Sequence, residues 1–282
     1  MSKIGDVLDK LFVPQSEADA PALHASVDRL CAEAGIKKPK ICFVDAEAQS
    51  LTPLKKFIYE HMCGAMHIGE PRIVLGEKFR AIMGHHSADA AVSEELESIL
   101  AHEIAHIKKG DVLLHKVIPL RMSPFIGMLA GIAGVWYYEH LQAKHKSRAL
   151  NKSEAQIQHD IHTEWKESDK PTEVIVPQVD TATTIAKHIA GGLLGFGVGT
   201  AVYAIGHRHI ELRADRISAE LMGSGKPLAN ALQTLRSGVQ NNISPEIREA
   251  YKKENSPLTR WLEGLTHPSD AERIERLNNW SR

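Results

Sequence analysis

Two histidines four residues apart, with a glutamate beside the first, form the group with the clearest chemical potential in this sequence. They are His102, Glu103 and His106 in the stretch ILAHEIAHIKKGD. Positions i and i+4 of a helix lie on one face, so the two imidazoles can converge on one point. This H-E-x-x-H pattern predicts that the imidazoles bind zinc while the glutamate transfers protons. The alternative is an amphipathic helix with two half-buried histidines that bind nothing.

A catalytic zinc ion needs a third protein ligand and one open position. The best candidates for the third ligand are Glu211 and Asp215 in ELRADR, which are four residues apart and share a helix face. One carboxylate would bind the metal, and the other would accept a hydrogen bond from a ligand imidazole and fix its tautomer. At this point either carboxylate can take either role. A solvated acidic face paired with Arg213 and Arg216 is the alternative.

The helix that carries the two histidines has clear start and stop signals. Ser93 is a suitable N-cap, and Glu94 and Glu95 follow it in the first turn. Lys108 and Lys109 fall in the last turn, and Gly110 stands where a left-handed residue is needed. The sequence therefore predicts a helix that ends at Lys109. We expect Asp111 to cap a following helix.

Other stretches predict a small mixed domain around this helix. Apolar spacing predicts a helix over 21–36 that ends at Gly35, and 40–45 and 72–76 are short strand-forming runs. The second run could offer an edge that pairs with an extended substrate. Residues 206–223 are predicted to be helical. The pattern of the region between the two strands predicts no particular element.

Two segments, 122–138 and 189–206, contain no charged residue. As helices they would span about 26 Å each, and the ~30 Å of a bilayer core is reached if Arg121 and Lys187 extend their heads to the interface. Both segments carry small residues at fourfold spacing, which lets helices approach closely in lipid. These are Gly127 and Gly131 in the first segment, and Gly191, Gly195 and Gly199 in the second. We predict a membrane hairpin, with a buried soluble hairpin as the alternative.

The composition narrows the class of protein. The 282 residues carry a formal net charge of −1, so nothing indicates a nucleic-acid partner. The three cysteines have no paired spacing and are interpreted as reduced, buried thiols rather than zinc ligands. The N-terminal stretch lacks the continuous apolar core of a secretory signal peptide.

Three motifs in order connect the sequence to a known family. HEIAHIKKGD, ELRADRISAE and THPSDAERIERL, with the two apolar segments between the first and second, resemble the HtpX-like and CaaX-prenyl-protease-like membrane zinc metallopeptidases. These enzymes are gluzincins, the zinc proteases with glutamate as third ligand. The resemblance implies a mostly helical α+β fold: a zincin-like protease domain with a small β-sheet and an inserted two-helix transmembrane hairpin. The family's Asn-Ala-Phe-Ala stretch has no clear copy, and CGAM at 63–66 is the nearest.

Three regions follow from this organisation. Residues 1–111 would form the N-terminal part of the catalytic domain, and 112–206 the membrane hairpin with a polar loop at 139–182. Residues 207–282 would complete the catalytic domain.

The resemblance also implies a role for each site residue. It implies one zinc ion per chain, with Glu103 as the base. The zinc ligands would be His102, His106 and Glu211; Asp215 would support a ligand imidazole, and His267 would help to stabilise the oxyanion.

The function expected is that of a membrane-anchored zinc endopeptidase in protein quality control, in which Glu103 assists the attack of a zinc-bound water on a peptide bond. Glu211 lies only five residues beyond the second apolar segment, so the substrates would be proteins in or near a lipid bilayer. The charge bias of the flanking regions favours a bacterial-type inner membrane with the active site facing the cytoplasm. The alternatives are a CaaX-processing endopeptidase, which needs a larger membrane chamber, a protease-like scaffold without turnover, and a non-catalytic metal-binding protein.

Overall fold

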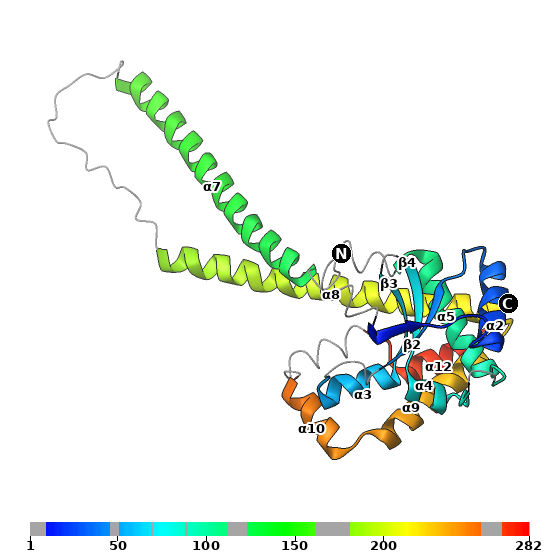
Figure 1. Ribbon diagram of the computed structural model, residues 1–282. Coiled ribbons are helices and arrows are strands. Elements are labelled where there is room, and N and C mark those ends of the chain that lie inside the picture. The colour runs from blue at the N-terminus through cyan, green and yellow to red at the C-terminus, as the bar shows by residue number, and fades with distance from the viewer. Residues whose placement is uncertain are drawn as a thin grey trace. The chain divides into compact units, whose positions relative to one another are not determined.

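The computed structural model describes residues 10–45, 51–68, 70–87, 90–111, 123–161, 181–254 and 267–281. The chain divides into two compact units (Figure 1). Unit 1 comprises Met1–Leu120 and Ala204–Arg282, and unit 2 is Arg121–Tyr203. The described residues combine many helices with one small sheet, which confirms a mostly helical α+β fold.

A four-stranded sheet lies in unit 1 with the strand order β1-β2-β4-β3. Its strands are β1 (Phe12–Pro14), β2 (Lys40–Val44), β3 (Cys63–Ile68) and β4 (Glu70–Leu75). Strands β2 and β4 are parallel, whereas β1 and β3 run antiparallel to their neighbours. The two strands predicted from sequence are confirmed. The expected edge at 72–76 was wrong, because β3 covers that side of β4 and is itself the edge strand.

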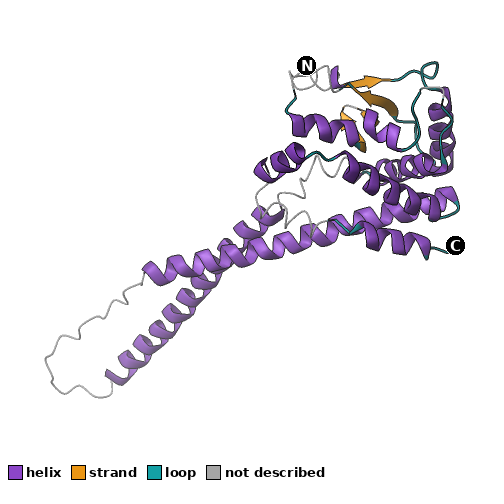
Figure 2. Cartoon of the chain, turned by 90° about the horizontal axis from the view of Figure 1, so that it is seen from below, coloured by secondary structure: helices purple, strands orange, loops and turns teal. Residues whose placement is uncertain are grey.

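In Figure 2 the helices of unit 1 lie below and beside this sheet. They are α2 (Pro21–Ala34), α3 (Pro53–His61), α4 (Glu77–Ile82), α5 (Glu94–Lys109), α9 (Lys226–Asn242), α10 (Pro245–Glu254) and α12 (Asp270–Asn278), together with the end of α8 (Thr181–Met222). Helix α2 stops at Gly35 as predicted, and the φ of 68° at this glycine is left-handed. Helix α8 stops likewise before Gly223, at φ 72°.

A single apolar cluster joins the sheet to helices α2, α5 and α9. Helix α5 lies at its centre, with contacts to α2, α9 and strand β3. Fully buried members include Leu30 from α2, Ile73 and Leu75 from β4, Leu100 from α5 and Leu228 from α9. Helix α5 is therefore packed against neighbours on several sides. This packing fixes the position of the helix face that carries His102 and His106.

Unit 2 contains α7 (Ser123–Ile161) and the first part of α8. The two helices touch through glycines, because a Cβ added to Gly131 would overlap the carbonyl oxygen of Gly191, and one added to Gly195 would overlap that of Gly127. The predicted glycine stripes thus form a close helix contact. Helix α7 continues through 139–161, so the polar loop predicted there was wrong. This stretch is rich in Ala, Lys, Gln and Glu, which favour helix without apolar periodicity; the rest of the predicted loop up to residue 180 lies outside the described residues.

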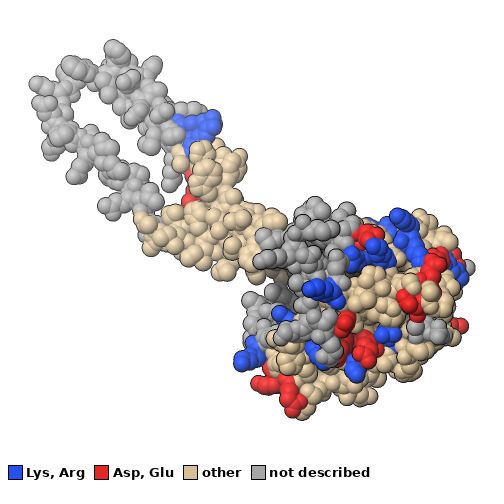
Figure 3. Space-filling model, in the orientation of Figure 1, with Lys and Arg blue, Asp and Glu red and all other residues tan. Residues whose placement is uncertain are grey.

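Large apolar side chains cover the outside of α7 and of the first part of α8. Leu193 and Leu194 are 69% and 73% exposed, and Trp136, Tyr137 and Tyr138 are about as open. Figure 3 shows an almost uncharged surface on the described part of these helices. Among the described helices, only α8 is long and apolar enough to cross a membrane. The predicted transmembrane pair therefore remains a proposal.

The glycine contact predicts that two glycine-to-alanine substitutions change the stability of the helix pair in opposite directions. Gly131→Ala should destabilise the helix pair by about 1–3 kcal/mol, because the methyl group overlaps the facing backbone. Gly134→Ala should stabilise it by about 0.5–1 kcal/mol, because nothing lies within 4 Å of its added methyl group. The measurement is the unfolding midpoint of the detergent-solubilised protein. Equal shifts in the two variants would contradict the close contact.

Candidate metal centre

Helix α5 presents His102 and His106 on one face. Its N-cap is Ser93, whose hydroxyl accepts a hydrogen bond from the backbone N–H of Leu96 at 3.2 Å. Its C-terminus is closed by Gly110 at φ 69°. Both predicted signals are confirmed, and the helix ends at Lys109 as expected.

Helix α8 crosses α5 at small side chains. Ala105 of α5 forms a buried cluster with Ala214 and Ile217 of α8. Beside it, the hydroxyl of Ser218 donates a hydrogen bond of 2.7 Å to the carbonyl oxygen of Ser98, and both residues are buried. Alanine side chains allow the two backbones to approach closely, so polar side chains next to the crossing can meet.

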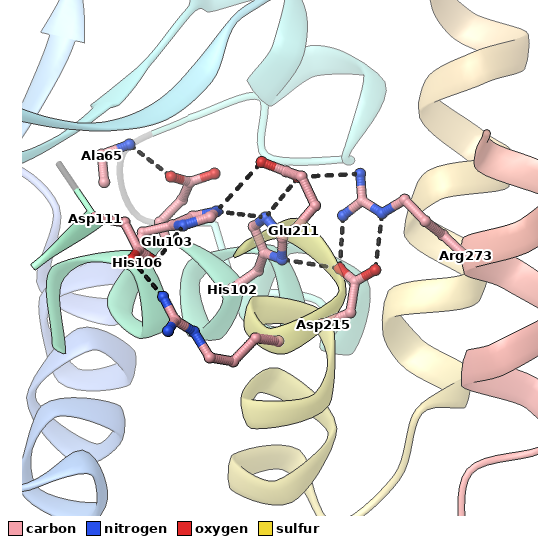
Figure 4. A network of polar contacts seen from close by, with 9 residues as sticks. Ala65, His102, Glu103, His106, Asp111, Glu211, Asp215 and Arg273 are labelled. Carbon is pink, nitrogen blue, oxygen red and sulfur yellow. Dashed lines mark hydrogen bonds and ion pairs between the residues drawn. The ribbon is translucent and has the colours of Figure 1, made fainter. Parts of the chain in front are cut away.

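The two imidazoles and one carboxylate converge at this crossing (Figure 4). The Nε2 atoms of His102 and His106 lie 3.1 Å apart. The carboxylate of Glu211 faces both, with Oε2 3.7 Å from Nε2 of His102 and Oε1 3.8 Å from Nε2 of His106. The structure thus brings together the three predicted ligands, although Glu211 lies about a hundred residues beyond the two histidines in the chain.

The other nitrogen of each ring faces an aspartate. Nδ1 of His102 lies 3.0 Å from Oδ1 of Asp215, as expected for the supporting carboxylate. Nδ1 of His106 lies 3.2 Å from Oδ2 of Asp111, which also pairs with Arg213. Sequence analysis gave Asp111 a capping role and missed this contact. Asp111 follows Gly110 directly and His106 lies in the last turn of the helix, so the sequence could have indicated this contact.

This donor set fits a zinc ion. When each Nδ1 donates its proton to its aspartate, both Nε2 atoms carry lone pairs that point at one another and at Glu211. Such a group of acceptors is stable only around a cation. Burial would lower the pKa of His106, but Asp111, Glu103 and Glu211 outweigh burial and raise it. Two imidazoles and one carboxylate with a fourth position free are the ligands of catalytic zinc sites.

Arg273 of α12 completes the network from the opposite side. Its Nε and one terminal nitrogen donate hydrogen bonds of 2.8 and 2.6 Å to the two carboxylate oxygens of Asp215. The other terminal nitrogen lies 3.7 Å from Oε2 of Glu211. Burial opposes ionisation, yet the bonds from Arg273 and the proximity of His102 lower the pKa of Asp215 to about 2. Burial is likewise outweighed at Glu211, whose pKa is lowered by His102, His106 and Arg273.

The third motif contains two arginines, and the sequence alone does not choose between Arg273 and Arg276. Only the tertiary structure separates them, because the side chain of Arg276 is 63% exposed and pairs with Glu272.

Glu103 lies in the cavity that the metal centre opens into. Its Oε2 accepts a hydrogen bond of 2.5 Å from the backbone N–H of Ala65 in β3. The cavity has a volume of about 530 Å³. Edge strand β3 lines it with Cys63, Gly64 and Ala65, which belong to the CGAM stretch. Its apolar lining comprises Phe79, Ile99, Leu228, Leu232 and Leu235.

His267 lies beside the metal centre rather than within it. Its side chain is exposed and does not line the cavity. The guanidinium of Arg208 donates a hydrogen bond of 3.3 Å to its carbonyl oxygen, and its ring centroid lies 4.3 Å from that of His207. Its part in stabilising an oxyanion stays a prediction.

Comparisons with known proteins found a family model, curated relatives and a solved structure that are similar to this chain. The model of peptidase family M48 matches residues 17–281. A protease HtpX homolog of Janthinobacterium is 26% identical over 93% of this chain and 74% of its own length. A homolog of the same name from Sulfurihydrogenibium is 26% identical over 94% of this chain and 75% of its own. A third from Polaromonas naphthalenivorans is 31% identical over 66% of this chain, and the match spans 53% of that protein. The crystal structure of S. mikatae Ste24p matches at a TM-score of 0.46 and 18% identity, over 98% of this chain and 56% of that one.

Removal of Arg273 should test how the buried network is held. Arg273→Met leaves the buried carboxylate of Asp215 without its cation and should lower the free energy of unfolding by about 3–5 kcal/mol. Arg276→Met is the matched control and should change it by less than about 1 kcal/mol, since its pair with Glu272 is exposed. Chemical denaturation of the chelator-treated proteins gives both values. A loss of the same size in the two variants would contradict the assigned role.

The lowered pKa of Asp215 predicts an acid dependence. Its ordinary value is 3.8, so its stabilisation, about 2 kcal/mol, is complete above pH 3.8 and is lost as the pH falls through about 2. Unfolding free energies between pH 4 and pH 2 should therefore fall more steeply in the wild type than in Asp215→Asn. Parallel curves would show that the carboxyl group is not stabilised in its charged form.

Proposed function

The chain belongs to peptidase family M48, and we propose that it is a membrane-anchored zinc endopeptidase acting on proteins in or near a lipid bilayer. The observation that carries this proposal is the convergence of His102, His106 and Glu211 on one point, with Glu103 beside them in the same cavity. Each ligand imidazole is backed by a carboxylate, as ligand histidines in metal sites usually are.

The chain's own residues would divide the work of hydrolysis. A zinc ion held by His102, His106 and Glu211 would supply Lewis acidity to the scissile carbonyl and to the attacking water. Glu103 takes the proton from the water and passes it to the leaving amine. The N–H of Ala65 holds one carboxylate oxygen of Glu103, which leaves the other free to accept that proton. This arrangement requires no nucleophilic serine or cysteine.

Strand β3 and the apolar lining of the cavity would bind the substrate. An edge strand has unpaired backbone groups, so an extended peptide can pair with β3 and pass beside Glu103. Side chains of Leu228, Leu232 and Leu235 would receive an apolar residue of that peptide. We therefore infer a preference for cleavage next to apolar residues.

The exposed apolar surface of α7 and α8 supports attachment to a membrane. Large hydrophobic side chains at this exposure are costly in water and favourable in lipid. The aromatic residues 136–138 are of the kind found at membrane interfaces. The proposed location is a bacterial-type inner membrane, with both helices in the bilayer and the metal centre on the cytoplasmic side. We infer quality control rather than CaaX processing, because two helices are too few to enclose a chamber in the membrane.

Glu103→Gln tests the mechanism. The amide cannot accept the proton, so the cleavage rate should fall by at least about 100-fold, while zinc bound per chain stays at the wild-type value. Glu94→Gln, at an exposed position on the same helix, is the matched control and should cleave at the wild-type rate. Unchanged cleavage by Glu103→Gln would exclude this residue as the base.

A second test concerns the substrate. The protein reconstituted in liposomes should cleave a membrane-embedded substrate faster than the detached soluble tail that contains the same peptide bond. The reason is that Glu211 follows the apolar segment of α8 by only a few residues, so a membrane-embedded segment would bring the proposed metal centre near the bilayer surface. Equal rates at equal concentrations would count against a membrane-bound substrate.

A further inference from the structure

A second group of possible metal ligands shares Glu211 with the first. His207, Glu211 and His267 each offer one ligand atom, and these atoms lie within 4.8 Å of one another. His207 and Glu211 are four residues apart on α8 and share a face. The two histidines do not line the cavity. They therefore lie outside the cavity of the proposed peptidase centre and share only Glu211 with it.

The two histidine rings are held in a defined arrangement. His207 is only 8% exposed, and its ring meets that of His267 edge to face at 68°. Arg208 holds the backbone of His267 through its carbonyl oxygen and pairs with Glu272 of α12. The segment that carries His267 is thus tied to α8 on the side of His207. The position of His267 is set by this contact and by the start of α12.

The charges around this group permit a second cation. Glu211 offers a carboxylate oxygen within 4.8 Å of a ring nitrogen of each histidine. Arg273 donates two hydrogen bonds to Asp215, and its other terminal nitrogen lies 3.7 Å from Oε2 of Glu211, so its charge is shared between two carboxylates. Arg208 is neutralised by Glu272. A carboxylate has two oxygens and can bridge two metal ions, one on each side.

We propose that His207, Glu211 and His267 form a second site for a divalent transition metal, with Glu211 as the bridging ligand. Two imidazoles and a carboxylate are suited to zinc, cobalt and nickel rather than to magnesium or calcium. The second site binds more weakly than the first because its carboxylate is shared and His267 is exposed to water. Its occupation by excess zinc lowers the rate of peptide cleavage, since Glu211 then divides its charge between two ions; this last consequence rests on the proposed function.

The stoichiometry of zinc tests the second site directly. The full-length protein with Glu103→Gln, which prevents self-cleavage, is titrated with zinc and its bound metal is counted by mass spectrometry. We expect two equivalents, one tight and one weaker. His207→Asn should lose the weaker equivalent, and His267→Asn, changed at an exposed position that folding tolerates, should lose it as well. His209→Asn is the matched control on the same helix; its exposed side chain should leave two equivalents.

His106→Ala separates this inference from the proposed function. If both hold, His106→Ala loses the tight equivalent and keeps the weaker one. If only the peptidase centre exists, the parent binds one equivalent, and both His207→Asn and His267→Asn keep it, which would overturn the second site. If only the second site exists, the parent binds one equivalent that His106→Ala keeps and His267→Asn loses.

Cobalt provides a readout that does not depend on activity. Cobalt bound by imidazole and carboxylate nitrogen and oxygen atoms absorbs visible light, so a second absorption change should follow the first in the wild type. It should be missing in His267→Asn. In the active protein, excess zinc should slow cleavage, and His207→Asn should remove that inhibition while His209→Asn keeps it. Inhibition of equal size in both variants would overturn the regulatory part of the proposal.

Discussion

The close crossing of α5 and α8 is the constraint on which the whole site depends. Ala105 lies between the two ligand imidazoles in the chain, and Ala214 lies between the two carboxylates of α8. Because both residues are small, the helices pack closely and their flanking polar side chains converge. The same packing buries these groups, and burial of a charge is unfavourable unless a partner of opposite charge or a metal ion compensates it. The fold and the chemistry of the site are therefore determined at the same place.

The buried charges at the crossing are balanced by pairs of side chains with opposite charge. Each imidazole faces an aspartate, and each aspartate in turn faces an arginine: Asp215 binds Arg273, and Asp111 binds Arg213. These pairs fix the orientation of the rings, so Nε2 of each ring is directed at the common point. They also connect elements far apart in sequence, because Arg273 comes from α12 near the end of the chain. Helix α12 therefore contributes a residue to the network of the candidate metal centre.

Helix α8 carries both a long apolar segment and two carboxylates of the candidate site. It contains the described segment that is long and apolar enough to cross a membrane, and it also supplies Glu211 and Asp215. Glycines allow α8 to pack closely against α7 in the apolar part, and alanines allow it to pack closely against α5 at the candidate site. Glu211, the proposed metal ligand, therefore follows the proposed membrane anchor by only a few residues.

Local patterns in the sequence determined much of this protein. The caps at Ser93 and Gly110 set the ends of α5, the i, i+4 spacings placed each pair of ligands on one face, and the apolar periods predicted α2 and two strands. These features depend on neighbouring residues, so the sequence shows them directly. The polar helix over 139–161 was missed because it follows from propensity and not from apolar periodicity.

Long-range contacts were decided only by the tertiary structure. The choice of Arg273 over Arg276, the contact of Asp111 with His106, the position of β3 at the sheet edge and the meeting of His207 with His267 all join segments that no local pattern relates. Their physical reason is packing: each contact exists because a buried core brings distant backbones together and leaves a polar group that must find a partner.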